Sequence, residues 1–198
     1  MHEFTFDPEG HVYKVNGVSL PSVTSVLPYN YRGNNEAAML KGTYVHDMCR
    51  LYLEDNLDEE SLDPALIPYL DAFKKFLNDS KGMGITGVFD IKSGAKTPCV
   101  ELQVSAYIEL ANNGVPMEAP KAMPVLEMPF YSPIHNFAGT PDIIIIDRKP
   151  ATEGFALYLK DNGRYNLSPI KDIRRNLETF LCFLRTKRWL MEKNLDTR

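Results

Sequence analysis

Residues 139–146 read GTPDIIII, which is a Gly-Thr-Pro turn, an aspartate and four isoleucines in succession. A run of β-branched apolar residues directly after a turn predicts a strand that is buried in a sheet. Asp142 then stands where the chain enters the sheet, at the rim of the core rather than in open solvent. Either its carboxylate caps the turn, or it forms a site with other polar groups at the same edge of the sheet.

The composition is that of one globular domain. The chain has 198 residues, of which 44% are hydrophobic and 24% are charged, enough to bury a core of ordinary size. No apolar run approaches the roughly 20 residues that span a bilayer, and the first residues lack an apolar signal core. We therefore expect a cytoplasmic protein without membrane contact. The cysteines, Cys49, Cys99 and Cys182, are too few and too scattered for a disulfide framework or a four-thiolate metal cluster.

Strand and helix signals alternate along the chain. Strands are predicted in two short N-terminal segments around the turn at 7–10, within 84–94, 123–133 and 137–146, and as a hairpin over 153–170. The hairpin turn, Asp161-Asn162-Gly163, is typical of type I′. Helices are predicted from an N-cap at Ser22, over 35–54, from a cap at Asp63 with Pro64 in the first position, over 99–114, and from a cap at Ser168 to about 194.

Strands interleaved with helices, without repeats or a long linker, indicate an α/β fold with a central mixed sheet flanked by helices. We expect a single domain over 1–198. Its first part, 1–34, would be an N-terminal hairpin and lead-in, and its last part, 160–198, a basic hairpin and C-terminal helix.

The segment GVFDIK contains the first group that could do chemistry. Asp90 and Lys92 are two residues apart on a predicted strand, so both side chains leave the same face. Such a pair can be a simple surface ion pair. If Asp90 and Asp142 instead converge from adjacent strands, they form a hard-oxygen site suited to Mg²⁺, with Lys92 beside it to act on a water or on developing negative charge. A second D-x-K, Asp147 and Lys149, lies at an exit turn before Pro150, and we reject it.

Two helices carry further polar pairs at a spacing of four residues, which places each pair on one face. Gly42 and His46 form one pair: the glycine lets another backbone come close, and the imidazole is either a metal ligand or a structural residue. Gln103 and Tyr107 form the other, where an amide and a phenol suit hydrogen bonds to a carboxylate, a phosphate or a base. Core packing explains the tyrosine equally well.

Together these motifs resemble the PD-(D/E)xK nuclease superfamily, in particular the RecB-type and phage-type exonuclease branch that includes mitochondrial genome maintenance exonuclease. That branch is marked by G-x-x-x-H, G-x-P-D, D-x-K and Q-x-x-x-Y, which occur here as GTYVH, GTPD, DIK and QVSAY. The resemblance extends over nearly the whole chain. It implies a restriction-endonuclease-like core and a metal-dependent DNA exonuclease of recombination, replication or repair, in a bacterial or phage-infected cell, with a single-strand annealing or recombination protein as a partner.

The resemblance also implies a role for each matching residue. His46, Asp142 and Asp90 would bind Mg²⁺ or Mn²⁺, with the Ile91 carbonyl as an extra ligand, and Lys92 would be catalytic together with the two aspartates. Gln103 and Tyr107 would support the site or the DNA, while Ser22 and Thr24 would offer hydroxyls or helix-start amides to phosphates. Glu127 occupies a position where such enzymes often carry an acid. Some members hold an iron–sulfur cluster, which the three cysteines here cannot supply.

The order of the motifs departs from that branch, because the D-x-K strand and its Q-x-x-x-Y helix (84–121) precede the P-D strand. A permuted connection can still build the site if the strands are neighbours in space. The alternatives are an inactive nuclease-like protein that binds nucleic acid, and a binder of small phosphates or carboxylates.

The charge of the chain is unevenly distributed. The net charge is −4, and 53–63 is an acidic block, but 160–198 contains ten Lys or Arg against five Asp or Glu. In the predicted C-terminal helix, basic residues stand beside an apolar stripe. The basic residues are Lys171, Arg174, Arg175 and Arg185, and the stripe is Ile170, Ile173, Leu177, Leu181 and Leu184. This face either follows a phosphate backbone or is simply solvated.

Overall fold

The structure of the chain, a computed structural model, describes residues 3–28, 36–94, 96–97, 99–118, 124–146 and 150–195. The helices are α1 (Val23–Val26), α2 (Glu36–Leu53), α3 (Ile67–Met83), α4 (Val100–Asn113) and α5 (Ile173–Glu192). The strands are β1 (Phe4–Asp7), β2 (Val12–Val15), β3 (Val18–Leu20), β4 (Gly87–Lys92), β5 (Val115–Pro116), β6 (Val125–Leu126), β7 (Phe130–Ser132), β8 (Phe137–Gly139), β9 (Ile143–Ile145), β10 (Gly154–Leu159) and β11 (Tyr165–Pro169).

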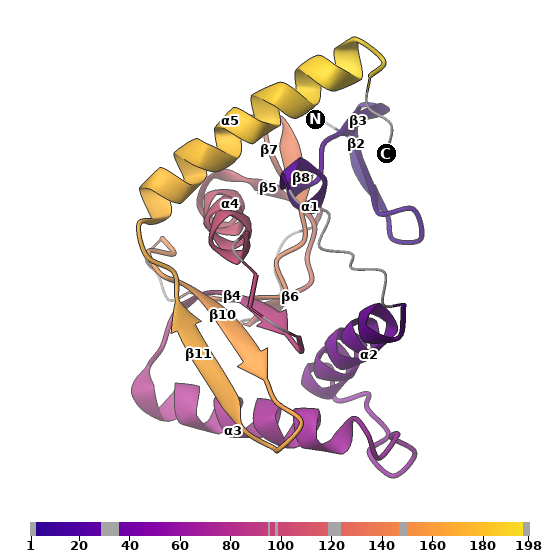
Figure 1. Cartoon of the computed structure of the whole chain (residues 1–198), viewed down its shortest axis with the longest axis vertical. Helices are drawn as coiled ribbons and strands as arrows, with labels where there is room; N and C mark the ends of the chain where they lie inside the picture. Colours follow the sequence, from indigo (N-terminus) through magenta and orange to yellow (C-terminus); the bar gives the residue numbers. More distant parts are fainter. Residues whose placement is uncertain are drawn as a thin grey trace.

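A five-stranded sheet in the order β11-β10-β4-β9-β6 forms the centre of the fold. β4 and β10 run parallel, and the other neighbours are antiparallel, so the sheet is mixed. Helices lie on both of its faces, with α4 and then α5 on one side and α3 on the other (Figure 1). The predicted α/β class with a mixed sheet flanked by helices is confirmed.

The alternation of side chains along β4 divides the core into two layers. Val88 packs with residues of α4 and α5, whereas Phe89 and Ile91 pack with residues of α2 and α3. All three are buried because the strand is covered on both faces. The even-numbered positions of β4, which include Asp90 and Lys92, therefore face α4.

Two smaller three-stranded sheets, β1-β2-β3 and β5-β7-β8, accompany the central one. The predicted N-terminal pair is β1 and β2, and a third strand, β3, follows through the turn Asn16-Gly17. Both turn residues have positive φ, 50° and 78°, as a type I′ turn requires. This dipeptide was the signal for β3, which the sequence analysis did not use.

Each of the two long strands predicted over 123–133 and 137–146 is broken into two. The first becomes β6 and β7, and the second becomes β8 and β9, with one member of each pair in the central sheet. The chain turns at Glu127, whose φ is 37°, a left-handed conformation that a strand cannot continue through. Pro141 separates β8 from β9 because proline lacks the N–H that a ladder needs.

Two predicted helix starts and one predicted turn type are wrong. The Asp63 side chain accepts a hydrogen bond from the Ala65 amide, but this caps only the turn before α3, which begins at Ile67. Ser168 lies in β11 opposite Ala156, so its backbone is extended, and α5 begins after Asp172 instead. In the hairpin turn only Gly163 of residues 161–163 has positive φ, at 74°, so the turn is not type I′. Ser22, in contrast, caps α1 as predicted.

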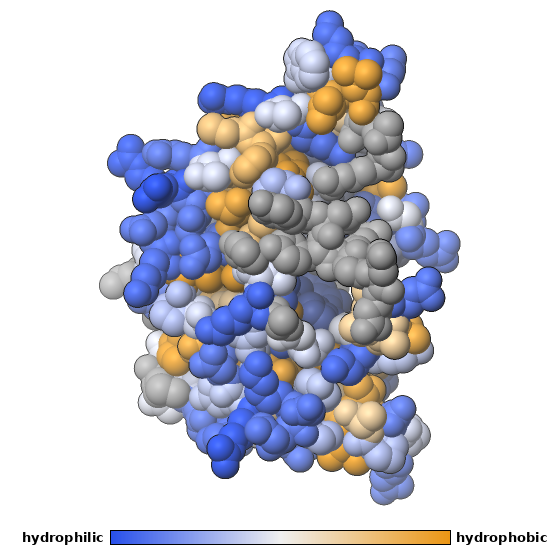
Figure 2. All heavy atoms as spheres, in the orientation of Figure 1, coloured by the Kyte–Doolittle hydropathy of each residue, from blue (hydrophilic) through white to orange (hydrophobic). Residues whose placement is uncertain are grey.

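Apolar side chains are largely enclosed between these layers. On the face drawn in Figure 2 hydrophilic residues dominate, and hydrophobic ones show in separate patches. Among the described residues no helix has both the length and the apolar character needed to cross a bilayer.

Candidate active site

The D-x-K motif forms the last part of β4. Asp90 is 1% exposed, and its Oδ2 lies 2.6 Å from Nζ of Lys92. The two side chains therefore leave the same face, as predicted. The pair is not a surface ion pair, because burial removes Asp90 from water and leaves Lys92 as its main compensation.

Asp142 reaches the same place from the neighbouring strand. It directly precedes β9, which pairs with β4 so that Phe89 is opposite Ile143. Asp142 Oδ2 accepts a hydrogen bond of 2.6 Å from the amide of Ile91. The expectation that Asp90 and Asp142 come from adjacent strands is confirmed, and the carboxylate is bound to β4 rather than acting as a cap of its own turn.

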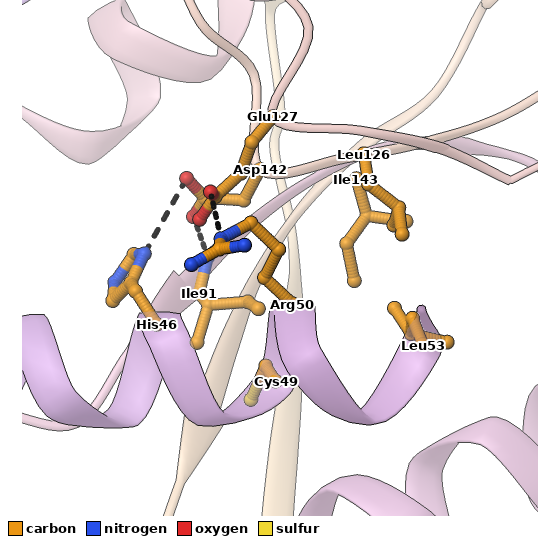
Figure 3. A pocket seen from close by; sticks show the side chains of 9 residues that line it. All are labelled: His46, Cys49, Arg50, Leu53, Ile91, Leu126, Glu127, Asp142 and Ile143. Atoms are coloured by element: carbon orange, nitrogen blue, oxygen red, sulfur yellow. Dashed lines mark hydrogen bonds and ion pairs between the residues drawn. The ribbon is translucent and has the colours of Figure 1, made fainter. Parts of the chain in front are cut away.

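His46 approaches Asp142 from α2. Its Nδ1 lies 3.5 Å from Oδ1 of Asp142, and Figure 3 shows both partners of this carboxylate, the imidazole and the Ile91 amide. Burial alone would lower the pKa of His46, but the Asp142 charge outweighs it and raises the pKa to about 9. The imidazole is thus a cation at neutral pH and must lose a proton before it can bind a metal.

Gln103 of α4 connects the remaining polar groups. Its Nε2 donates to Asp90 Oδ1 at 3.0 Å and to the Tyr107 hydroxyl at 3.3 Å. Its Oε1 accepts from Lys92 Nζ at 3.5 Å. The half-buried Gln103 amide fixes Asp90 and Lys92 relative to each other. Tyr107, 4% exposed, supports this amide from one turn further along α4.

The two aspartates differ in their protonation behaviour. Burial raises the pKa of Asp90 to about 6; the Lys92 ammonium opposes this rise and the Asp142 charge adds to it. Burial also disfavours ionised Asp142, but His46, Lys92 and the Ile91 amide hold its pKa below the ordinary value. Two neighbouring carboxylates whose pKa values are pushed apart are typical of catalytic sites, although structural ion pairs also perturb pKa values.

Arg50 and Glu127 complete the wall of a pocket next to Asp142 (Figure 3). Arg50 Nε lies 3.2 Å from Glu127 Oε2, and the Glu127 amide donates to the Asp142 carbonyl at 3.1 Å. Through these two contacts Glu127 links α2 to the segment Pro141-Asp142, the P-D segment. Burial, and then the Asp142 charge, raises the pKa of Glu127 to about 7. Sequence reasoning missed Arg50, although its position four residues after His46 places both on one helix face.

The donor set can be compared with what Mg²⁺ or Mn²⁺ requires. Within the described part of the chain, no group of three or more His, Cys, Asp or Glu side chains is arranged to hold a metal. Magnesium does not depend on such a group, because it usually binds one or two carboxylates, several waters and substrate phosphates. Among the described residues, Asp90 Oδ2 is buried without a hydrogen bond and has only the ion pair with Lys92. A buried carboxylate oxygen beside a second carboxylate fits such a cation.

Other expected residues are placed differently. Among the described residues, a side chain on Gly42 would meet Ser93 Oγ at 3.8 Å and no backbone atom within 4 Å. Ser22 is 7% exposed, and its hydroxyl accepts from the Ser25 amide, so it caps α1; its expected contact with a phosphate stays a prediction. Thr24 is exposed and lies 3.3 Å from the Ser22 hydroxyl. The Ile91 amide donates to Asp142 Oδ2, and the expected role of the Ile91 carbonyl as a metal ligand stays a prediction.

The rejected D-x-K, Asp147 and Lys149, lies outside the described residues. Compared with known protein families, with curated proteins and with solved structures, the chain has no match. The site is therefore interpreted from its own geometry.

Proposed function

We propose that this chain is a Mg²⁺- or Mn²⁺-dependent DNA exonuclease with a restriction-endonuclease-like core of permuted connectivity. The supporting observation is that four sequence motifs from α2, β4, α4 and the segment before β9 meet around one buried pair of carboxylates. The permuted order does not separate them, because β4 and β9 are hydrogen-bonded neighbours.

In this proposal Asp90 and Asp142 hold the metal, and His46 joins them once it is neutral. The bound cation would polarise a phosphodiester and lower the pKa of a water. Lys92 is a cation at neutral pH: burial would lower its pKa, but Asp90 and Asp142 raise it. An ammonium cannot accept a proton, so Lys92 orients the attacking water or stabilises the charge that develops on the phosphate.

Gln103 and Tyr107 position the catalytic groups and do not react. The amide bonds both Asp90 and Lys92, so it keeps the lysine aimed along the carboxylate. We further propose that the enzyme acts in the cytoplasm of a bacterial or phage-infected cell, with a single-strand annealing or recombination protein as its partner in processing DNA ends.

The test is degradation of linear end-labelled DNA and of the same DNA as a covalently closed circle. We expect loss of the linear form in Mg²⁺ or Mn²⁺, none in Ca²⁺, whose looser coordination and weaker Lewis acidity do not support the chemistry, and survival of the circle. Asp142→Asn should be inactive, whereas Asp55→Asn, the same change in the exposed turn after α2, should behave as wild type.

Each rival function gives another result. Full activity in excess EDTA would contradict the metal mechanism. DNA binding without cleavage in any metal would favour the inactive nuclease-like protein. Binding of inorganic phosphate or small carboxylates without binding of DNA would favour the small-molecule binder.

A further inference from the structure

Two lysines lie against the ring of Tyr158 in β10. Lys96 Nζ is 5.6 Å and Lys160 Nζ is 5.4 Å from the ring centroid. Tyr158 itself is 2% exposed, so the lysines have an aromatic support beneath them, and cation–π contacts of this length hold an ammonium in place. We refer to these three residues as the Tyr158 lysine cluster.

The cluster adjoins the candidate active site. In the parallel pairing of β10 with β4, Tyr158 is opposite Lys92, and Lys160 directly follows the last residue of β10. Lys96 is the fourth residue after the end of β4. Both lysines therefore lie beyond the carboxyl ends of the parallel strands β4 and β10. Electrostatic coupling of Tyr158 to Lys92 and Asp90 also places the ring beside the D-x-K motif.

Within the described part of the chain, Lys96 and Lys160 have the Tyr158 ring as a partner rather than a carboxylate. Neither forms a salt bridge with a carboxylate among the described residues, whereas Lys74 is 2.6 Å from Glu59 and Lys75 is 3.0 Å from Asp79. Glu101 is the acidic side chain besides Asp90 that acts on Tyr158. Two cations that form no salt bridge with a described residue, beside a buried acidic site and on a chain of net charge −4, indicate where a polyanion can approach.

We propose that the Tyr158 lysine cluster binds the phosphate backbone of the DNA strand next to the phosphate that is cut. This inference rests on the proposed function and names its substrate-binding surface. The cluster has a positional advantage over the basic face of α5. α5 packs on the side of α4 away from the sheet (Figure 1), and the side chain of Arg174, 93% exposed, is already paired with Glu178 at 3.1 Å.

The experiment compares two double variants that remove the same charge. Lys96→Gln with Lys160→Gln removes the cluster, and Arg174→Gln with Arg175→Gln removes two charges from α5. Binding of a short fluorescent single strand, and of its duplex, is measured in Ca²⁺ over a range of salt concentrations. Each phosphate contact contributes about 0.7 to the slope of log affinity against log salt for a single strand and about 0.9 for a duplex.

For the cluster variant we expect the slope to fall by about 1.4 with the single strand, a loss of roughly 25-fold at about 0.1 M salt. Lys96→Arg with Lys160→Arg should restore it, because the charge is kept. The α5 variant should retain the wild-type slope and cleavage. A slope that changes only in the α5 variant, or in neither, would overturn the inference while cleavage by the wild type leaves the proposed function intact. A wild type that binds no DNA would overturn both.

Discussion

At the scale of single residues, Lys92 has two roles, and replacing its side chain affects both of them at once. It is proposed to act on the phosphate, and it also compensates the buried charge of Asp90 at 2.6 Å. Removing one partner of a buried pair leaves the other charge without compensation. The stability of a Lys92 variant and its turnover therefore have to be measured separately.

We expect Lys92→Ala to abolish cleavage and to lower the free energy of unfolding by roughly 2 kcal/mol, since the pair is partly open to solvent on the lysine side. Asp90→Asn combined with Lys92→Ala should recover most of the stability and none of the activity. Chemical denaturation of both variants measures the free energy of unfolding, and a cleavage assay measures their activity. A stable, active Lys92→Ala would refute the role of this motif.

Tyr13 provides a second prediction, which concerns pH. It is 0% exposed, and its hydroxyl lies 2.7 Å from Oγ1 of Thr140. Burial raises the pKa of Tyr13 to about 12 from the model-peptide value of 10.0, although the bond to Thr140 opposes the rise. Folding therefore favours the neutral phenol, so this contribution is complete below pH 10 and is lost as the pH rises through about 12.

The free energy of unfolding should accordingly fall by roughly 2 kcal/mol across that window, a value set by the shift in pKa. Tyr13→Phe should flatten the curve there and cost about 1 kcal/mol at neutral pH through the lost hydrogen bond. Urea denaturation at a series of alkaline pH values measures both. Tyr165, whose pKa is also raised to about 12 by burial and Asp79, should leave a residual slope; an unchanged slope in Tyr13→Phe would contradict the assignment.

At the scale of elements, α2 contains a glycine that the fold does not require. A Cβ on Gly42 would meet Ser93 Oγ at the ordinary distance of 3.8 Å. Alanine is favoured over glycine inside a helix by about 1 kcal/mol. Since Gly42 shares a helix face with His46, we infer that, under the proposed function, the missing side chain makes room for the substrate.

Gly42→Ala should therefore raise the free energy of unfolding by about 0.5–1 kcal/mol while reducing cleavage. Gly82→Ala is the matched control: Gly82 lies in α3, and a Cβ there would meet no described atom within 4 Å, so this change should stabilise the protein without changing activity. Thermal denaturation and initial cleavage rates distinguish the two. If both variants are equally active, the glycine serves only the helix.

At the scale of the whole molecule, sequence rules correctly predicted the features that depend on neighbouring residues alone, such as helix position and the face that a side chain occupies. The helices predicted over 35–54 and 99–114 agree with α2 and α4 to within one residue at each end. The two-residue spacing of Asp90 and Lys92 predicted their common face. The rules failed where strand pairing competes with a local signal. Serine is a favoured helix N-cap residue, but Ser168 is part of β11, because its backbone pairs with Ala156 of β10.

The candidate site was predicted as a set of residues but not as a network. That Gln103 bonds Asp90, and that Arg50 holds Glu127 against the P-D segment, depends on how α4 and α2 dock on the sheet. Docking geometry arises from the packing of many side chains, and no spacing within one element specifies it. The roles of Glu127 and of the Tyr158 lysine cluster were unreadable from sequence for the same reason.

The hydrogen bond between Ile91 and Asp142 joins residues 51 positions apart in the chain. Contacts of such sequence separation must overcome a large loop-closure entropy and form slowly compared with helices. An α2 helix that has formed by itself carries His46 but no carboxylate partner, and a β4 strand without β9 carries only half of the acidic pair. Under the proposed function, a partly synthesised or partly refolded chain therefore lacks the assembled pair of carboxylates, and cleaves no DNA, until β9 pairs with β4.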